Sequence, residues 1–457
     1  MRKLFGTDGI RGIAGEYPLD EGTTFAIGQA LGHYLLRSHA GARVVIGQDT
    51  RQSSEWIANS LGRGLMSRGV AVESAGVITT PGVAFLARTR DFAAGVVVSA
   101  SHNPWRDNGI KIFGHDGYKL PDEVELDIER EIFKHLEKTS AAEHVPPVRT
   151  LPGDPTLREA YLEWLVYSVT EDLSNINALV DCANGAATPI AHEVLRRCGL
   201  GATFIHDVPD GRNINADCGA LHPEVVAAAV RDGNSESALK RYALGITFDG
   251  DADRALFCDD DGNVVNGDAI LLLAARAMQQ RGALVNDIVV ATTMSNMGLE
   301  IALRRSGIQM LRAPVGDKYV LEEMKRSGAV LGGEQSGHII FRDGEATTGD
   351  GLLTALRVMA KMVRSRQSLA EMVSDLKVFP QTIKNIRVRE KKPFDQVPEI
   401  AESIREAEKE LDGDGRIVVR YSGTEALARV MVEAESDEKM RRLTAIVADA
   451  IQRNLGH

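Results

Sequence analysis

Residues 95–104 read GVVVSASHNP, a short apolar run that passes directly into a polar loop. The same pattern recurs where residues 44–46 precede GQDTR, where residues 178–180 precede DCANG, and where residues 244–248 precede an aspartate-rich loop. Helix-like stretches follow these loops, and this β-α repeat predicts an α/β fold with mixed, largely parallel sheets. In such sheets ligands bind beyond the carboxyl ends of the strands, so we expect these loops to carry the chemistry.

Length and charge limit the classes of protein that the chain can represent. At roughly 100–200 residues per domain, 457 residues predict three or four domains. Hydrophobic residues make up 44% and charged residues 26%, which is an ordinary globular balance. The formal net charge of −11 argues against a general nucleic-acid binder. An anionic substrate is therefore expected to be held by a local cluster of cations.

The chain shows no signal for a membrane, a disulfide framework or a zinc site. Its longest apolar stretch, residues 269–278, is interrupted by Arg276 and is too short to span a bilayer, and the first residues lack a signal-peptide core. A cytoplasmic location and no membrane partner are expected. The cysteines have no C-x-x-C spacing, so we expect reduced bystanders. They are Cys182, Cys198, Cys218 and Cys258.

Proline and glycine clusters mark domain boundaries. The segments 146–147 and 151–155 indicate the first boundary, and a change to charged, alternating sequence after about residue 376 indicates a small C-terminal α+β unit. The predicted domains are 1–152, 153–248, 249–375 and 376–457.

The loop after residue 98 places two hydroxyls, those of Ser99 and Ser101, at the end of a buried strand. A serine in such a position can act as a nucleophile or carry a phosphate. The alternative is a Ser/Asn/Pro turn that forms for backbone reasons alone.

Three carboxylates follow the strand at 244–248. An extended segment would turn Asp249, Asp251 and Asp253 to one side, where they repel one another unless a hard cation neutralises them. Oxygen-only ligation suits Mg²⁺. An EF-hand is disfavoured because its sixth position would be Arg254 instead of glycine. A solvated acidic turn fits residues 259–262 better.

Two further loops have the composition of ligand-binding loops. Residues 332–338, GGEQSGH, offer a carboxylate, a hydroxyl and an imidazole that could grip sugar hydroxyls, and the alternative is a glycine turn in water. Residues 420–425, RYSGTE, combine a guanidinium, two hydroxyls and backbone N–H groups, which suits a phosphate dianion. A plain loop between two strands is the alternative. Nucleotide-binding glycine motifs are missing, so nucleotide use is disfavoured.

Five motifs in order resemble those of the α-D-phosphohexomutases, over nearly the whole chain. They are FGTDGIRG at 5–12, SASHNP at 99–104, DGDADR at 249–254, GEQSGH at 333–338 and RYSGTE at 420–425. The first and fourth favour the branch that acts on glucosamine phosphates over the phosphoglucomutase/phosphomannomutase branch. The resemblance implies three similar α/β domains plus a C-terminal α+β domain, with the active site in the central cleft between all four.

The resemblance also implies a role for individual residues. Ser101 would be the phosphoserine, and its phosphate would bind one Mg²⁺ per subunit together with Asp249, Asp251 and Asp253. Substrate would be held by Glu334, Ser336 and Arg254, and its non-reacting phosphate by Arg420, Ser422, Gly423, Thr424 and Arg429. Tyr421 and Ala426 depart from the family pattern, which has prolines there.

The implied activity is that of an isomerase. Phospho-Ser101 would donate to a hydroxyl of a hexosamine phosphate, through a hexosamine 1,6-bisphosphate that is both intermediate and activator, and would interconvert glucosamine 6-phosphate and glucosamine 1-phosphate for UDP-N-acetylglucosamine and cell-wall precursor synthesis. Lys111 and Arg11 are candidates for proton handling and charge stabilisation, or else structural ion-pair partners, and His338 is a further candidate.

Two functions of other classes remain open. A metal-dependent sugar phosphatase would use a similar serine and acid cluster but release inorganic phosphate. A non-catalytic sugar-phosphate sensor would need no acidic triplet beside a serine. The sequence leaves the number of subunits open, with a homodimer as one option.

Overall fold

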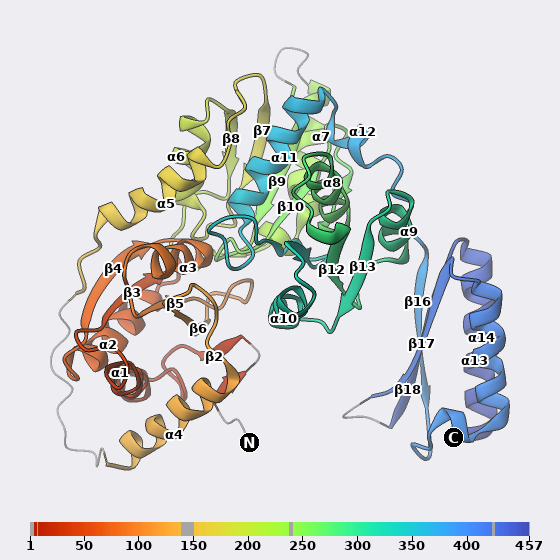
Figure 1. Cartoon of the computed structure of the whole chain (residues 1–457), viewed down its shortest axis with the longest axis horizontal. Coiled ribbons are helices and arrows are strands. Elements are labelled where there is room, and N and C mark those ends of the chain that lie inside the picture. The colour runs from red at the N-terminus through yellow and green to blue at the C-terminus, as the bar shows by residue number, and fades with distance from the viewer. Residues whose placement is uncertain (1–3, 7, 139–149, 237–240, 423–425, 457) are drawn as a thin grey trace. The chain divides into compact units, whose positions relative to one another are not determined.

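The structure is a computed structural model that describes residues 4–6, 8–138, 150–236, 241–422 and 426–456. The chain forms two compact units (Figure 1). Unit 1 comprises Met1–Thr293 and Leu311–Val373, and unit 2 comprises Met294–Met310 and Ser374–His457. Among the described residues, no helix combines the length and the apolar character needed to cross a membrane.

The first sheet of unit 1 carries the serine loop. Its strands are β1 (Phe5–Gly6), β2 (Gly9–Ile13), β3 (Arg43–Gln48), β4 (Ala71–Val77), β5 (Ala94–Val98) and β6 (Asp107–Gly114). They lie in the order β1-β2-β6-β5-β3-β4, with β3 parallel to β4 and β5 and the remaining pairs antiparallel. The helices are α1 (Glu21–Leu36), α2 (Ser54–Met66), α3 (Thr80–Thr89) and α4 (Asp122–Lys138).

Side-chain alternation divides the core of this domain between the two faces of the sheet. Val44 and Ile46 belong to the large core cluster that also contains the buried residues of α1, α2 and α4. Gly47 faces the other way, and a Cβ built on it would lie 2.4 Å from Val83 of α3. Glycine therefore lets α3 pack directly on the sheet, while the other three helices share the opposite face.

The second sheet carries the acidic loop. Its strands are β7 (Asn177–Asp181), β8 (Gly201–Ile205), β9 (Leu244–Phe248), β10 (Ala255–Cys258) and β11 (Val264–Val265), in the order β11-β10-β9-β7-β8. The helices that accompany this sheet are α5 (Pro155–Tyr167), α6 (Thr188–Arg197), α7 (Pro223–Glu236) and the 3₁₀ turn η1 (Gly219–Leu221). The boundary predicted between residues 248 and 249 falls inside a single sheet, because β10 pairs with β9 on one side and with β11 on the other.

The third sheet consists of β12 (Ile288–Thr292), β13 (Gln309–Ala313), β14 (Leu331–Gly333) and β15 (Ile339–Phe341), in the order β13-β12-β14-β15. The accompanying helices are α8 (Gly267–Gln280), α10 (Asp317–Ser327), α11 (Gly351–Ser365) and α12 (Leu369–Val373), with the short turn η2 (Val285–Asp287). Residues 334–338 of the GGEQSGH segment join β14 to β15.

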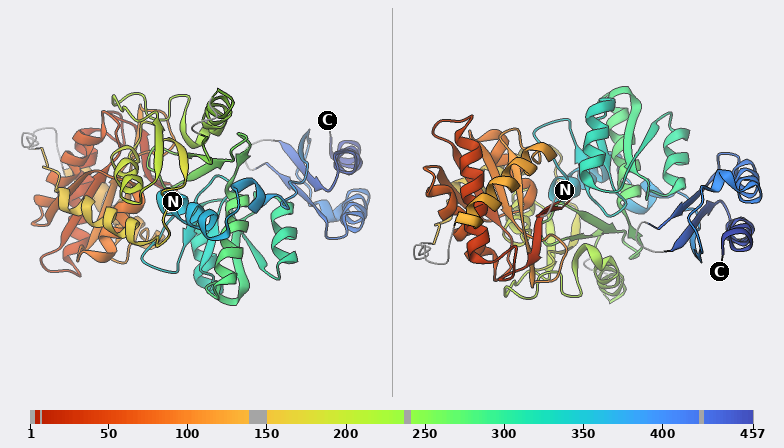
Figure 2. Two further views of the ribbon diagram at one scale, coloured as in Figure 1. Left: turned by 90° about the horizontal axis from the view of Figure 1, so that it is seen from above. Right: turned by 90° about the horizontal axis from the view of Figure 1, so that it is seen from below.

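Unit 2 is an antiparallel sheet covered on one face by helices (Figure 2). The strands are β16 (Gln381–Arg387), β17 (Gly415–Tyr421) and β18 (Leu427–Ala434), in the order β16-β18-β17. The helices are α13 (Pro398–Leu411) and α14 (Asp437–Leu455), preceded by η3 (Phe394–Gln396), and α9 (Met297–Arg305) also belongs to this unit. Buried Ile386, Val430 and Val432 pack against the helices. The predicted α+β unit and the predicted α/β fold class are confirmed.

Candidate active site around Ser101

Ser101 lies in a buried polar loop directly after β5. It is 1% exposed, and its φ of 52° lies in the left-handed region that few non-glycine residues adopt. The buried guanidinium of Arg51 fixes this loop by donating to the carbonyl oxygens of Ser101 and Asn103, each at 2.8 Å, and to that of Pro104. Asp49 in turn accepts from Arg51 Nε at 2.8 Å. The GQDTR loop after β3 therefore holds the serine loop in place.

Hydrogen bonding distinguishes the two serines of this loop. Ser101 Oγ donates to Asp249 Oδ2 at 2.7 Å. Ser99 Oγ instead donates to Asp49 Oδ2 at 2.6 Å and accepts from the backbone N–H of Ser101 at 2.9 Å. The Ser99 hydroxyl is thus a structural part of the loop, and the Ser101 hydroxyl faces the acidic residues.

The acidic loop between β9 and β10 meets the serine loop at Gly250. A Cβ at Gly250 would lie 2.5 Å from Ser101 O, so only glycine permits this approach. The carboxylates of Asp249, Asp251 and Asp253 converge as predicted, but the predicted reason was wrong. The segment is a turn in which Ala252 has φ 54°, and it is not an extended strand.

These three carboxylates fit a hard dication. One oxygen from each lies within 4.8 Å of the other two, and all three residues are buried. Asp251 Oδ1 and Asp253 Oδ1 have no hydrogen-bond partner among the described residues. Burial, together with the charges of Asp253 and Asp251, raises the pKa of Asp249 well above its usual range. Buried oxygens without donors and mutual repulsion are what a bound Mg²⁺ would relieve.

Lys111 provides part of the opposing charge. Its Nζ lies 2.9 Å from Asp251 Oδ2, 3.1 Å from Asp8 Oδ2 and 3.6 Å from Asp253 Oδ2. Burial alone would lower the pKa of Lys111, but these carboxylates outweigh it and raise the pKa well above its usual value. Lys111 is therefore a buried ammonium. Arg11 donates to Asp8 and, at 3.4 Å, to Asn103 Oδ1.

Sequence reasoning missed three charged residues that extend this network. Asp8 accepts from Arg11 and Lys119, and Lys119 Nζ also donates to Asp317 Oδ2 at 2.6 Å. Burial would raise the pKa of Asp8, but Lys111, Lys119 and Arg11 together lower it well below its usual range. Asp8 lies inside the FGTDGIRG motif at residues 5–12, and that motif is the sequence signal that could have identified it. Lys119 and Asp317 carry no sequence signal, since only the fold joins them.

His338 is buried beside the acidic loop. Its Nδ1 lies 3.6 Å from Asp253 Oδ1, and its Nε2 accepts from the backbone N–H of Gly349 at 3.1 Å. That hydrogen bond requires Nε2 to be unprotonated, so the ring proton resides on Nδ1, toward Asp253.

A pocket of about 410 Å³ opens beside these groups. Glu334 lines it with a buried carboxylate, whose Oε1 accepts from Gly316 N at 2.9 Å. Arg254 lines it too, together with Arg11, Asp253 and His338. Ser336 is exposed and is not among the lining residues, and its Oγ lies 3.5 Å from Glu334 Oε2. The structure therefore brings Glu334 and Arg254 to the pocket but leaves Ser336 outside it.

The predicted phosphate loop belongs to unit 2. Arg420, near the end of β17, pairs in register with Arg429 of β18, so both guanidiniums project from the same face of the sheet. Ser422 is buried and its N–H donates to Leu427 O at 2.8 Å. Gly423 and Thr424 lie outside the described residues.

Tyr421, which stands where the family pattern has a proline, is held by contacts of its own side chain. Its ring stacks on Phe394 with centroids 4.3 Å apart, and its hydroxyl donates to Lys392 O at 2.5 Å. Ala426 O accepts from Val388 N at 3.0 Å. Both departures from the family pattern are thus anchored by contacts on the neighbouring segments.

Family models match four successive parts of the chain. They are described as phosphoglucomutase/phosphomannomutase alpha/beta/alpha domain I at residues 2–139, domain II at 159–262, domain III at 266–379 and the C-terminal domain at 383–450. The model for domain II includes the acidic loop, in agreement with the sheet to which that loop belongs.

Curated relatives match the whole chain. It is 62% identical to a phosphoglucosamine mutase of Koribacter versatilis, with 100% of this chain and 98% of that protein covered, and 49% identical to one of Solibacter usitatus, with 100% and 99% covered. Among solved structures, a phosphoglucomutase/phosphomannomutase family protein of Burkholderia thailandensis superposes with a TM-score of 0.78 at 23% identity, covering 100% of both chains. The chain thus belongs to the phosphoglucomutase/phosphomannomutase family.

Proposed function

We propose that this chain is an isomerase that interconverts glucosamine 6-phosphate and glucosamine 1-phosphate, and so feeds UDP-N-acetylglucosamine and cell-wall precursor synthesis. The observation that carries the proposal is the hydrogen bond from buried Ser101 Oγ to Asp249, beside two further carboxylates with unsatisfied oxygens. The relatives named phosphoglucosamine mutase, 62% and 49% identical over 98% and 99% of their lengths, favour glucosamine phosphates as substrates.

Mg²⁺ would be held by Asp249, Asp251, Asp253 and the phosphate on Ser101. When bound, it would neutralise charge on the serine oxygen as the phosphoryl group departs. The structure of an N-acetylphosphoglucosamine mutase from Aspergillus fumigatus, described as a complex with GlcNAc-6P and magnesium, has the same fold, with a TM-score of 0.62 at 20% identity over 99% of this chain and 96% of that one.

In the first half-reaction, the bond between Ser101 Oγ and phosphorus breaks and a bond from phosphorus to the free sugar hydroxyl forms. The product is hexosamine 1,6-bisphosphate, which turns over and returns its other phosphoryl group to Ser101. Such transfers need positioning and charge neutralisation above all. Lys111, held as an ammonium 2.9 Å from Asp251, and Arg11 supply positive charge next to the reacting group. The proton that the sugar hydroxyl loses would end on Ser101 Oγ, which then donates it to Asp249 in a hydrogen bond until the serine is phosphorylated again.

Two groups of residues would recognise the substrate. Glu334 in the pocket would accept hydrogen bonds from the sugar, and its carboxylate favours the ammonium at C2 of glucosamine over a hydroxyl. Ser336 would contribute only after the loop moves, since it lies outside the pocket. The phosphate that is not reacting would be held by Arg420, Ser422, Gly423, Thr424 and Arg429. The location of the active site in a cleft between all four domains stays a prediction.

Two further predictions concern the location of the protein in the cell and its number of subunits. We infer that the chain acts in the cytoplasm, because its substrate is a phosphorylated sugar of precursor synthesis. The homodimer stays a prediction.

The test pairs intact mass with a product assay. The purified protein should lose one phosphoryl mass on phosphatase treatment, and the phosphorylated form should convert glucosamine 6-phosphate to the 1-phosphate. Release of inorganic phosphate without isomer would identify a sugar phosphatase. Binding of sugar phosphate without either product would identify a sensor. Equal or better kcat/KM with glucose or mannose phosphates would reassign the substrate and leave the mechanism in place.

A further inference from the structure

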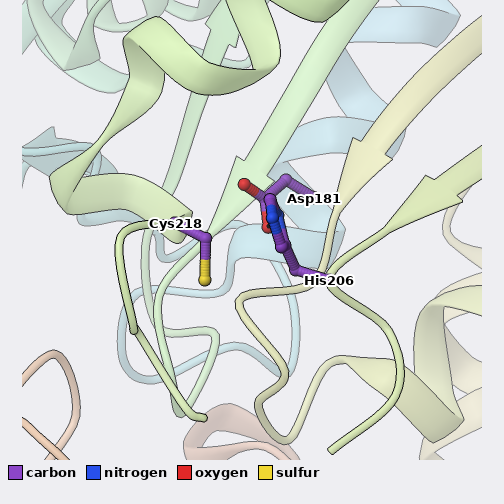
Figure 3. Close-up of side chains that lie close together, drawn as sticks. All are labelled: Asp181, His206 and Cys218. Carbon is purple, nitrogen blue, oxygen red and sulfur yellow. Dashed lines mark ion pairs between the residues drawn. The ribbon is translucent and has the colours of Figure 1, made fainter.

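A second cluster of metal-ligating side chains lies at the second sheet, which also carries the acidic loop, and it is separate from the residues around Ser101. Asp181 is the last residue of β7, His206 directly follows β8, and Cys218 directly precedes η1. A carboxylate oxygen, a ring nitrogen and the sulfur of these residues lie within 4.8 Å of one another (Figure 3). Asp181 and Cys218 are fully buried, whereas the side chain of His206 is 34% exposed.

The donor atoms are fixed in place but not satisfied. Asp181 Oδ1 accepts from Ala183 N at 2.8 Å and Oδ2 from Gly219 N at 3.0 Å, which orients the carboxylate and leaves each oxygen a lone pair. His206 Nδ1 is a buried atom that makes no hydrogen bond to any described residue, although it lies 3.2 Å from Asp181 Oδ1. A buried ring nitrogen that makes no hydrogen bond carries a free-energy cost, which a bound metal ion would relieve.

We propose that Asp181, His206 and Cys218 bind a zinc ion, with water in the fourth tetrahedral position. Oxygen, nitrogen and sulfur together form a ligand set that zinc accepts and magnesium does not. Binding would release the thiol proton of Cys218 to solvent and leave the thiolate on the metal. The partly exposed side chain of His206 gives the metal a route from solvent. The site is distinct from the acidic triplet, because none of its ligands belongs to that loop.

Such an ion would also position the serine loop. The segment that carries Cys218 carries Asn215, whose Nδ2 donates to Ser101 O at 2.9 Å and to Asn103 O at 3.2 Å. Asn215 N in turn donates to Ala183 O at 2.9 Å. Zinc would hold the 215–218 segment against the end of β7, and the segment would hold the loop of the proposed phosphoserine.

Zinc retention tests the proposal. The full-length protein is stripped with chelator, given excess Mg²⁺ to occupy the triplet, incubated with Zn²⁺, desalted and analysed for metal by mass spectrometry. Wild type and Cys198→Ser, a cysteine at the end of α6 outside the cluster, should each retain about one zinc ion per chain. Cys218→Ser and His206→Asn should bind zinc at least about tenfold more weakly. Asparagine is chosen because His206 has φ 46°, which asparagine tolerates.

Cobalt provides a readout that does not depend on activity. Co²⁺ in place of zinc should give a thiolate-to-metal charge-transfer band in wild type and in Cys198→Ser, and none in Cys218→Ser. Three outcomes would overturn the proposal: no zinc retained by wild type in Mg²⁺, undiminished zinc in both cluster variants, or zinc lost on Asp251→Asn instead. The second cluster variant covers the case in which one of them does not fold, as judged by circular dichroism.

Discussion

The carboxyl ends of β9 and β7, neighbouring strands of one sheet, carry two clusters made of different atoms. The cluster after β9 contains only carboxylates, and two of its buried oxygens accept no hydrogen bond from any described group. The cluster at the end of β7 combines one carboxylate with an imidazole and a thiol, and backbone N–H groups already hold its carboxylate. Topology thus determines where in this sheet ligands are expected, and donor chemistry determines which ligand each place would take.

The largest effect should follow from separating the serine from the acidic cluster. Ser101→Ala should abolish turnover and remove one phosphoryl mass from the peptide that spans residues 99–104, because no other described hydroxyl of this loop faces Asp249. The Ser99→Ala variant is the control and should keep its phosphate on Ser101. Mutase activity within about tenfold of wild type, or phosphate on Ser99, would show that the nucleophile is wrong.

Removing one carboxylate should distinguish the two clusters. Asp251→Asn should lower kcat severely with the fold preserved, chelation should stop the wild-type reaction and Mg²⁺ should restore it. Zinc retention should be unaffected. Asp261→Asn changes an exposed residue of the neighbouring acidic turn and should leave activity unchanged. Full activity of Asp251→Asn in chelator would eliminate the magnesium assignment.

In unit 2 the residues predicted to bind phosphate are cations, whereas those beside Ser101 are carboxylates. Replacing one of these cations should lower activity less than the two changes above. Arg420→Ala should raise KM while Ser101 remains phosphorylated, because a charge-assisted contact to the distal phosphate contributes about 1.5–3 kcal/mol. Arg405→Ala, on the surface of α13, is the matched control. An unchanged KM would show that the Arg420–Arg429 pair faces something other than substrate.

Asp350 shows what burial does to a carboxylate without neighbouring acids. It caps α11, accepts from Tyr161 at 2.8 Å, and burial raises its pKa to about 6. The pKa of Asp350 is higher in the folded protein than in the unfolded chain. Its carboxyl group therefore contributes fully to the free energy of unfolding below about pH 3.8, and this contribution is lost as the pH rises through about 6. Asp350→Asn should therefore gain about 1–2 kcal/mol of stability relative to wild type between pH 5 and pH 8.

Denaturation midpoints of both proteins across that range check this prediction. The control is Asp154→Asn, at the exposed cap of α5, where hydrogen bonds from Thr156 lower the pKa. Its stability relative to wild type should stay constant from pH 5 to pH 8. A constant difference for Asp350→Asn as well would contradict the raised pKa.

Local patterns predicted the places of most elements and loops. The apolar run before Ser101 is β5, and the run before Asp249 is β9, with the expected polar loops after each. The boundary at residue 248 was misplaced because an antiparallel return strand, β10, has the same apolar texture as the start of a new domain.

Contacts between distant segments could not be predicted. Lys119 and Asp317 pair across 198 positions, and no spacing rule connects them. The same limit applies to Cys218: the absence of C-x-x-C pairs excludes one kind of zinc site, but it says nothing of a cluster assembled from three loops. All four cysteines are free of disulfides, and the zinc proposal concerns only Cys218.

Transfer of label from the serine tests the central claim most directly. The protein carrying radiolabelled phosphate on Ser101 is mixed with unlabelled glucosamine 6-phosphate in Mg²⁺ and quenched within one turnover. We expect the label in glucosamine 1,6-bisphosphate first and in glucosamine monophosphate later, with the serine rephosphorylated by unlabelled phosphate. Label released as inorganic phosphate, or label that stays on the protein while glucosamine 1-phosphate accumulates, would contradict the account.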